Sequence, residues 1–105
     1  MRLKAGVKLA HLSPQMALGA AIVAAVYSRF GVECVVTSAN DSKHSQRSKH
    51  YVGDALDFRT KQATLDGREE DLREEVKAAL GDDFDVVLED VGTDNEHLHV
   101  EYDPK

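Results

Sequence analysis

Two short segments of this 105-residue chain contain residue types that together can bind a metal ion. Residues 48–57 read Ser-Lys-His-Tyr-Val-Gly-Asp-Ala-Leu-Asp, and residues 96–99 read Glu-His-Leu-His. Imidazole and carboxylate groups are ligands of catalytic zinc sites, which use three protein ligands and leave a fourth position to water. The single cysteine of the chain excludes a closed site of several thiolates. Because water on such a zinc ionises near neutral pH and the metal polarises a carbonyl, the residues indicate hydrolysis.

The acidic composition of the chain restricts its partners. The net charge is −6 and the isoelectric point is near 5.2. Non-specific binding to nucleic acid needs clustered Lys and Arg that replace counterions on the phosphates, so we expect no nucleic acid partner. One local exception is the cationic cluster of Lys43, His44, Arg47 and Lys49. This cluster is either a rim that receives a substrate carboxylate or a solvated polar loop.

The length of the chain fits one soluble domain with a modest core. Cys34 lies in an apolar run and cannot form an intramolecular disulfide, so we expect a buried thiol. The apolar run at residues 17–26 is shorter than the roughly 20 residues that span a membrane, and no signal peptide is evident. We expect a monomer that is synthesised in the cytoplasm and has no membrane partner.

The pattern of apolar residues predicts two helices and four strands. The first helix begins after Ser13 as N-cap, with Pro14 at its first position, and ends at Gly31. The second helix spans residues 68–80, with acidic residues in its first turn. The strands span residues 33–38, 55–59, 84–89 and 97–102, and residues 39–49 form a long loop. The sequence predicts a small α+β domain in which helices pack on one side of an antiparallel sheet.

The alternation of side chains along the strands gathers the polar residues on one face of the sheet. Asp57 lies on the face opposite Leu56 and Phe58, and the last strand places His97 and His99 on one face with Glu101. Two histidines therefore approach one site, which we expect on the open side of the sheet.

These residues carry a family resemblance. The pattern Ser-x-His-x-x-Gly-x-Ala-x-Asp, followed by His-x-His, resembles the zinc D-Ala-D-Ala carboxypeptidase and L-alanyl-D-glutamate endopeptidase family. That family shares its fold with the Hedgehog signalling domain and includes bacteriophage endolysins, and the resemblance covers residues 37–59 and 84–104. It implies that His50, Asp57 and His99 bind one Zn²⁺, while water or the scissile carbonyl oxygen takes the open position. It also implies a Hedgehog/DD-peptidase fold for the chain.

Other motif positions receive roles from the same resemblance. Ser48 would orient the loop that carries His50 and, with Arg47, contact the substrate. Gly53 would allow a backbone turn that a side chain would obstruct. For Ser48 and Gly53, a simple turn-forming role is an equal alternative.

The family also uses a glutamate as general base and then as general acid. Glu96 is the first candidate because it matches the family spacing Glu-x-x-His, provided that the last strand begins after it. Glu89, at the end of the preceding strand, is the rival candidate, and Asp94 is a weaker one. His97 would hydrogen-bond the oxyanion or the substrate carboxylate.

The chain departs from the family at one position. Many relatives carry an aromatic residue and an arginine after the Thr-Ser pair that matches residues 37–38, whereas this chain has Ala-Asn-Asp. Another cationic residue would then replace that arginine in contacting the substrate. The candidates are Arg47, Lys43, His44 and Arg59, and the sequence does not distinguish among them.

The resemblance predicts a zinc metallopeptidase that hydrolyses peptidoglycan stem peptides at bonds involving D-amino acids. Such a protein would act on the cell wall, and a phage lysis role follows by analogy. The bond and the choice between endopeptidase and carboxypeptidase stay open. The alternative is a binding domain of the same fold that contains zinc but does no chemistry. A third reading is an acidic structural protein without a metal.

Overall fold

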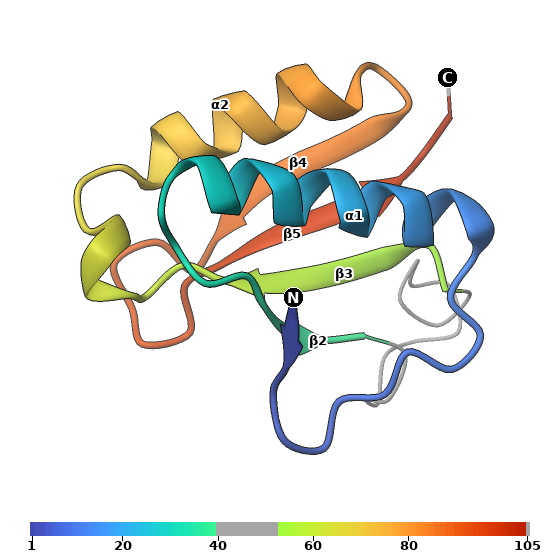
Figure 1. Cartoon of the computed structure of the whole chain (residues 1–105), viewed down its shortest axis with the longest axis horizontal. Helices are drawn as coiled ribbons and strands as arrows, with labels where there is room; N and C mark the ends of the chain where they lie inside the picture. Colours follow the sequence, from blue (N-terminus) through green and yellow to red (C-terminus); the bar gives the residue numbers. More distant parts are fainter. Residues whose placement is uncertain (40–52, 105) are drawn as a thin grey trace.

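The computed structural model describes residues 1–39 and 53–104, which contain two α-helices, a short 3-10 helix at Ala63–Leu65 and five strands. The strands form one sheet, and both helices cover the same face of it (Figure 1). The predicted α+β class is confirmed, and so is the position of the helices. In the described ranges, no helix has both the length and the apolar character needed to cross a membrane.

Helix α1, Pro14–Arg29, begins where the capping pattern predicts. The Ser13 hydroxyl accepts a hydrogen bond from the Met16 backbone N–H at 3.1 Å and so satisfies a donor that the helix itself leaves unpaired. Gly19 of this helix lies against β4, because a Cβ there would come within 2.9 Å of the Phe84 ring. The small residue therefore allows α1 to approach the sheet closely.

Helix α2, Glu69–Leu80, begins one residue later than predicted. Its buried side chains are Leu72 and Val76, and its exposed face is strongly charged. The Lys77 ammonium donates hydrogen bonds to the carbonyls of Gly81 and Phe84, at 3.1 and 2.6 Å. These bonds join the end of α2 to the start of the next strand.

The strands are β1 (Arg2–Leu3), β2 (Val35–Ser38), β3 (Ala55–Arg59), β4 (Phe84–Glu89) and β5 (His97–Tyr102). Their order in the sheet is β1-β2-β3-β5-β4. Neighbours from β2 to β4 are antiparallel, but β1 is parallel to β2, so the prediction of a wholly antiparallel sheet is wrong at this edge. The parallel pair rests on two backbone bonds, from the Arg2 N–H to the Cys34 carbonyl and from the Lys4 N–H to the Val36 carbonyl.

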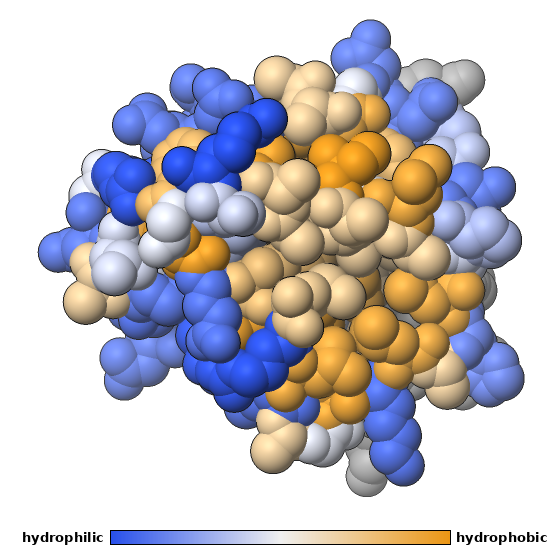
Figure 2. All heavy atoms as spheres, viewed as in Figure 1, coloured by the Kyte–Doolittle hydropathy of each residue, from blue (hydrophilic) through white to orange (hydrophobic). Residues whose placement is uncertain are grey.

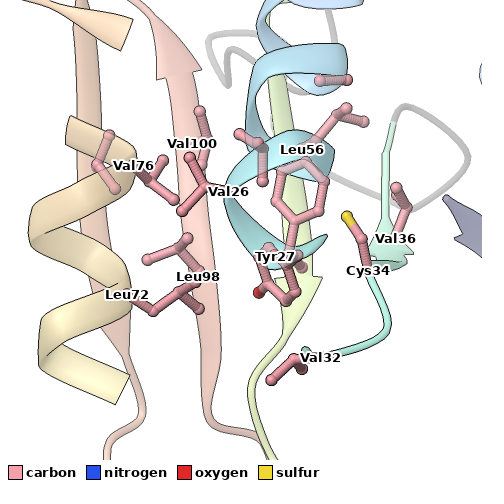
Figure 3. Close-up of a cluster of buried hydrophobic side chains, with 14 of the residues drawn as sticks. Val26, Tyr27, Val32, Cys34, Val36, Leu56, Leu72, Val76, Leu98 and Val100 are labelled. Atoms are coloured by element: carbon pink, nitrogen blue, oxygen red, sulfur yellow. The ribbon is translucent and has the colours of Figure 1, made fainter. Parts of the chain in front are cut away.

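The hydrophobic core lies between the helices and the sheet (Figure 3). Alternate residues of β3 and β5 point into it, and Figure 3 shows Leu56, Leu98 and Val100 opposite Val26 of α1. The Tyr27 hydroxyl, also buried, donates a hydrogen bond of 2.9 Å to the Arg59 carbonyl. Cys34 is buried, as predicted, and burial raises the pKa of its thiol to about 11.

The outer surface of α1 is largely apolar (Figure 2). Leu18, with 67% of its surface exposed, is the most exposed large apolar residue of this helix. The apolar side chains of β3 and β5 point toward the helices. Because side chains alternate along a strand, the polar side chains of these strands lie on the opposite face of the sheet.

Candidate metal centre

The polar face of the sheet brings residues from three neighbouring strands together. Asp57 of β3 pairs with His99 of β5, and Arg59 of β3 pairs with His97. On the other side of β5, Glu89 of β4 pairs with His97. The predicted convergence of Asp57, His97 and His99 on one face is therefore present.

Both ring nitrogens of His99 contact carboxylates. Nδ1 lies 2.9 Å from Asp57 Oδ1, and Nε2 lies 2.7 Å from Glu101 Oε1. When Nε2–H donates to Glu101, a neutral ring leaves its lone pair on Nδ1, beside Asp57. A carboxylate that orients a histidine through its second nitrogen is the usual outer partner of a metal ligand.

His97 is held in a similar way by a backbone carbonyl. Its Nδ1 lies 2.7 Å from the Asn95 oxygen, and its Nε2 lies 2.9 Å from Glu89 Oε1 and 3.7 Å from Asp57 Oδ2. Since a carbonyl only accepts, Nδ1 carries a proton. In the neutral ring, Nε2 is then free to bind a metal or to accept a proton.

The surrounding carboxylates shift the titration of both histidines. Burial lowers the pKa of His99, but hydrogen bonds to Asp57 and Glu101 and nearby negative charge outweigh this and raise the pKa to about 9. For His97, burial also lowers the pKa, and the Asn95 carbonyl with the charges of Asp57 and Glu89 raises it overall. Without a metal, His99 is therefore mostly protonated at neutral pH.

The donor atoms lie close enough together to share one metal ion. In a tetrahedral site with bonds of about 2.0 Å, two ligand atoms lie about 3.3 Å apart. His99 Nδ1 and Asp57 Oδ1, at 2.9 Å, are slightly closer than this, and His97 Nε2 and Asp57 Oδ2, at 3.7 Å, are slightly farther apart. Asp57, Glu89 and His97 also place ligand atoms within 4.8 Å of one another. Asp57 can therefore share a metal ion either with His99 or with His97.

Three predicted site residues, His50, Ser48 and Arg47, lie outside the described residues. The motif glycine next to them is described. Gly53 has a φ of +82°, and a Cβ there would overlap the His11 carbonyl oxygen. Its own carbonyl accepts a hydrogen bond of 2.9 Å from the Ser13 N–H. The expected need for glycine at this turn is confirmed, and the turn leads directly into β3 with Asp57.

The two candidate bases have different surroundings. Strand β5 begins at His97, directly after Glu96, as the prediction for Glu96 required. However, the buried Glu96 carboxylate accepts hydrogen bonds from the Thr60 hydroxyl at 2.7 Å and the Gly92 N–H at 3.2 Å. Glu89 instead contacts His97 at 2.9 Å and has 46% of its side chain exposed. Glu89 is the glutamate that faces the histidines and the solvent.

A hollow of about 370 Å³ opens beside Asp57 and His97, and we call it the site hollow. The turn between β4 and β5 contributes to its wall, including Asp94. Lys4, Arg59 and Lys61 also line the hollow. Of these three residues, only Arg59 was a candidate from the sequence. Lys4 reaches the hollow through the pairing of β1 with β2, which the sequence did not predict.

Two other features lie near this centre. A larger hollow of about 740 Å³ follows β4 and α2 but includes neither Asp57 nor His97, so we do not place the chemistry there. Asp85, Glu101 and Asp103 also lie within 4.8 Å of one another. Exposed acidic groups often gather without a metal, and we assign no second metal to them.

Comparisons with known proteins gave no match, either to protein-family models, to curated proteins or to solved structures. The family resemblance therefore rests on the motif residues and stays a prediction.

Proposed function

We propose that this protein is a zinc peptidase that hydrolyses peptidoglycan stem peptides at bonds involving D-amino acids. The observation that carries the proposal is the contact between Asp57 and His99, two predicted ligands from segments 42 residues apart. The choice of substrate rests on the motif of residues 48–57 and 96–99. Zn²⁺ would be held by His50, Asp57 and His99, and it would acidify water and polarise the scissile carbonyl.

Asp57 and Glu101 would favour His99 as a metal ligand. Asp57 adds negative charge next to Nδ1, and Glu101 accepts the proton on Nε2. Because strands β3 and β5 are fixed by the core on their other face, the pair is held on a rigid element.

We assign the role of general base to Glu89 instead of Glu96. Glu89 Oε1 lies 2.9 Å from His97 Nε2 and 3.9 Å from His99 Nδ1, so its carboxylate lies beside both histidines. It would accept a proton from the attacking water and return it to the leaving amine. His97, when protonated, would donate from Nε2 to the oxyanion. Glu96 would hold the turn between β4 and β5 through Thr60 and Gly92.

One observation favours the second candidate, a zinc-containing binding domain without catalysis. The Glu89 carboxylate is engaged with His97. If this pair persists when a peptide is bound, no carboxylate remains to accept the proton from water. The domain would then bind stem peptides and leave them intact.

Digestion of purified muropeptides, followed by mass spectrometry, separates the two candidates. We expect Glu89→Gln to keep zinc and reduce the cleavage rate by at least about 100-fold, the usual contribution of a positioned base. Glu96→Gln should retain most of the rate, and Glu74→Gln on the exposed face of α2 serves as a matched control. Zinc loading without any cleavage by the wild-type protein would favour the binding domain. If Glu96→Gln loses cleavage but retains zinc, Glu96 and not Glu89 is the general base.

A further inference from the structure

The two oxygens of the Asp57 carboxylate lie near different histidines. Oδ1 lies 2.9 Å from His99 Nδ1, and Oδ2 lies 3.7 Å from His97 Nε2. A carboxylate that offers one oxygen to each of two positions can bridge two metal ions, which in dinuclear hydrolytic sites lie about 3.5–4 Å apart. Asp57 therefore has the arrangement of a bridging ligand.

A second group of ligand atoms lies on the His97 side of Asp57. Glu89 Oε1 lies 2.9 Å from His97 Nε2, and Asp57, Glu89 and His97 place ligand atoms within 4.8 Å of one another. Among the described residues, this group does not include His99. Because His97 Nδ1–H donates to the Asn95 carbonyl, Nε2 is the atom that can bind a metal. The group is therefore a possible metal position separate from His99 Nδ1.

The sheet holds these three ligands in place and leaves them accessible. Glu89 and His97 are cross-strand neighbours on β4 and β5, and Asp57 lies on β3, the other neighbour of β5. The core fixes these strands from their opposite face. Asp57 and His97 line the site hollow, and 46% of the Glu89 side chain is exposed. A cation can therefore reach the group from solvent.

The charge around the histidines can compensate more than one zinc ion. Three carboxylates contact His97 and His99, namely Asp57, Glu89 and Glu101. One Zn²⁺ compensates two of these negative charges and leaves one for a second cation. The site hollow has four acidic and three basic lining residues, so it adds no net positive charge.

We propose that Asp57, Glu89 and His97 form a second zinc position beside the catalytic one, with Asp57 as the bridging ligand. The second ion binds more weakly than the first, because two cations so close together repel each other. Its effect on cleavage rests on the proposed peptidase function. A second Zn²⁺ engages Glu89, the proposed general base, and His97, the proposed oxyanion donor, so excess zinc inhibits the enzyme.

Zinc binding tests the second position without any reference to activity. Zn²⁺ is titrated into the metal-free full chain, and binding is measured by calorimetry and by competition with a chromophoric chelator. We expect two zinc ions per chain. Glu89→Gln should keep the first and weaken the second by at least about 100-fold, because it removes a charged ligand. Glu74→Gln, on the exposed face of α2, should keep both.

Asp85→Asn distinguishes this position from the acidic group of Asp85, Glu101 and Asp103, which could also attract zinc. We expect Asp85→Asn to keep the second zinc ion. A wild-type protein that binds only one zinc ion would overturn the second position. A second ion that survives Glu89→Gln, or one that is lost in Asp85→Asn, would overturn it as well.

Substitution with Co²⁺ tests the bridge itself. Two Co²⁺ ions joined by the Asp57 carboxylate interact magnetically, so the electron paramagnetic resonance spectrum of the two-cobalt form should differ from twice the one-cobalt spectrum. The same titration of Glu89→Gln should give the one-cobalt spectrum only. A wild-type signal that simply doubles with the second ion would place that ion away from Asp57.

The cleavage rate then separates this position from the peptidase function. We expect cleavage of a stem peptide to rise up to one zinc per chain and to fall at least about 100-fold when the second ion is bound. Two bound zinc ions that depend on Glu89, with no cleavage at any zinc level, would reject the peptidase and keep the second position. Full cleavage with both ions bound would overturn the inhibition.

Discussion

Asp57 and His99 lie opposite each other on β3 and β5, with Asp57 Oδ1 2.9 Å from His99 Nδ1. The contact joins a carboxylate and an imidazole that are far apart in the sequence, and the remaining nitrogen of His99 is occupied by Glu101. A metal bound at Nδ1 would replace the proton that this contact holds. Metal binding to this pair should therefore release a proton from His99.

Removal of the Asp57 charge should weaken zinc binding strongly. We expect Asp57→Asn to reduce zinc affinity by at least about 100-fold, because an amide is a neutral and poorer ligand than a carboxylate. Competition with a chromophoric chelator measures this. Asp71→Asn, on the exposed face of α2, is the matched control and should have no effect. Equal affinities of the wild-type protein and Asp57→Asn would remove Asp57 from the ligand set.

The raised pKa of His99 sets the pH range in which zinc binds. The ordinary pKa is 6.5, and the folded, metal-free value is about 9. The protonated ring stabilises the metal-free fold fully below pH 6.5, and this stabilisation is lost as the pH rises through 9. Zinc affinity runs in the opposite direction and should rise about tenfold per pH unit between pH 6.5 and 9.

NMR titration of the metal-free protein reports the His99 pKa directly, and chelator competition at several pH values reports the affinity. A His99 midpoint near 6.5, together with an affinity that is flat above pH 7, would contradict the contacts of His99 with Asp57 and Glu101.

Glu101 should act on the metal through His99. We expect Glu101→Gln to lower the pKa of His99 and, after correction for that proton, to lower zinc affinity by about 10- to 100-fold. Asp85→Asn removes one negative charge from the residue that pairs with Glu101 across β4 and β5, and it should change both quantities less. If the two variants behave alike, Glu101 contributes only general negative charge.

The hydrogen bond between Thr60 and Glu96 should stabilise the fold. Both residues are buried, and Thr60→Val would leave the Glu96 carboxylate without one of its donors. We expect a loss of about 1–3 kcal/mol in the free energy of unfolding, measured with urea on zinc-saturated protein. Thr64→Val, at an exposed position, is the control and should stay within about 0.5 kcal/mol of wild type. An equally small effect of Thr60→Val would show that Glu96 does not depend on this bond.

Much of the fold was predictable because the sequence patterns are local. The strands at 55–59, 84–89 and 97–102 have the predicted bounds, since their side chains alternate clearly, and the Ser13 cap marks the start of α1. Strand β1 has two residues, too few for any periodicity, and its pairing depends on the backbone of residues 34–36. Its parallel direction was therefore not predictable.

The candidate site was predictable in its residue types and less so in its contacts. Motif spacing and strand alternation placed Asp57 with His97 and His99. The pairing of Glu89 with His97 depends on the register of β4 against β5, which the intervening turn sets. Likewise, Lys4 reaches the site hollow only because β1 joins the sheet.

The most direct test of the zinc peptidase is the titration of zinc into metal-free protein while cleavage of a stem peptide is measured. We expect no cleavage without metal and a linear increase in cleavage that ends at one zinc per chain, with no such increase for Asp57→Asn. Cleavage by the metal-free protein, or no cleavage at one bound zinc per chain, would contradict it.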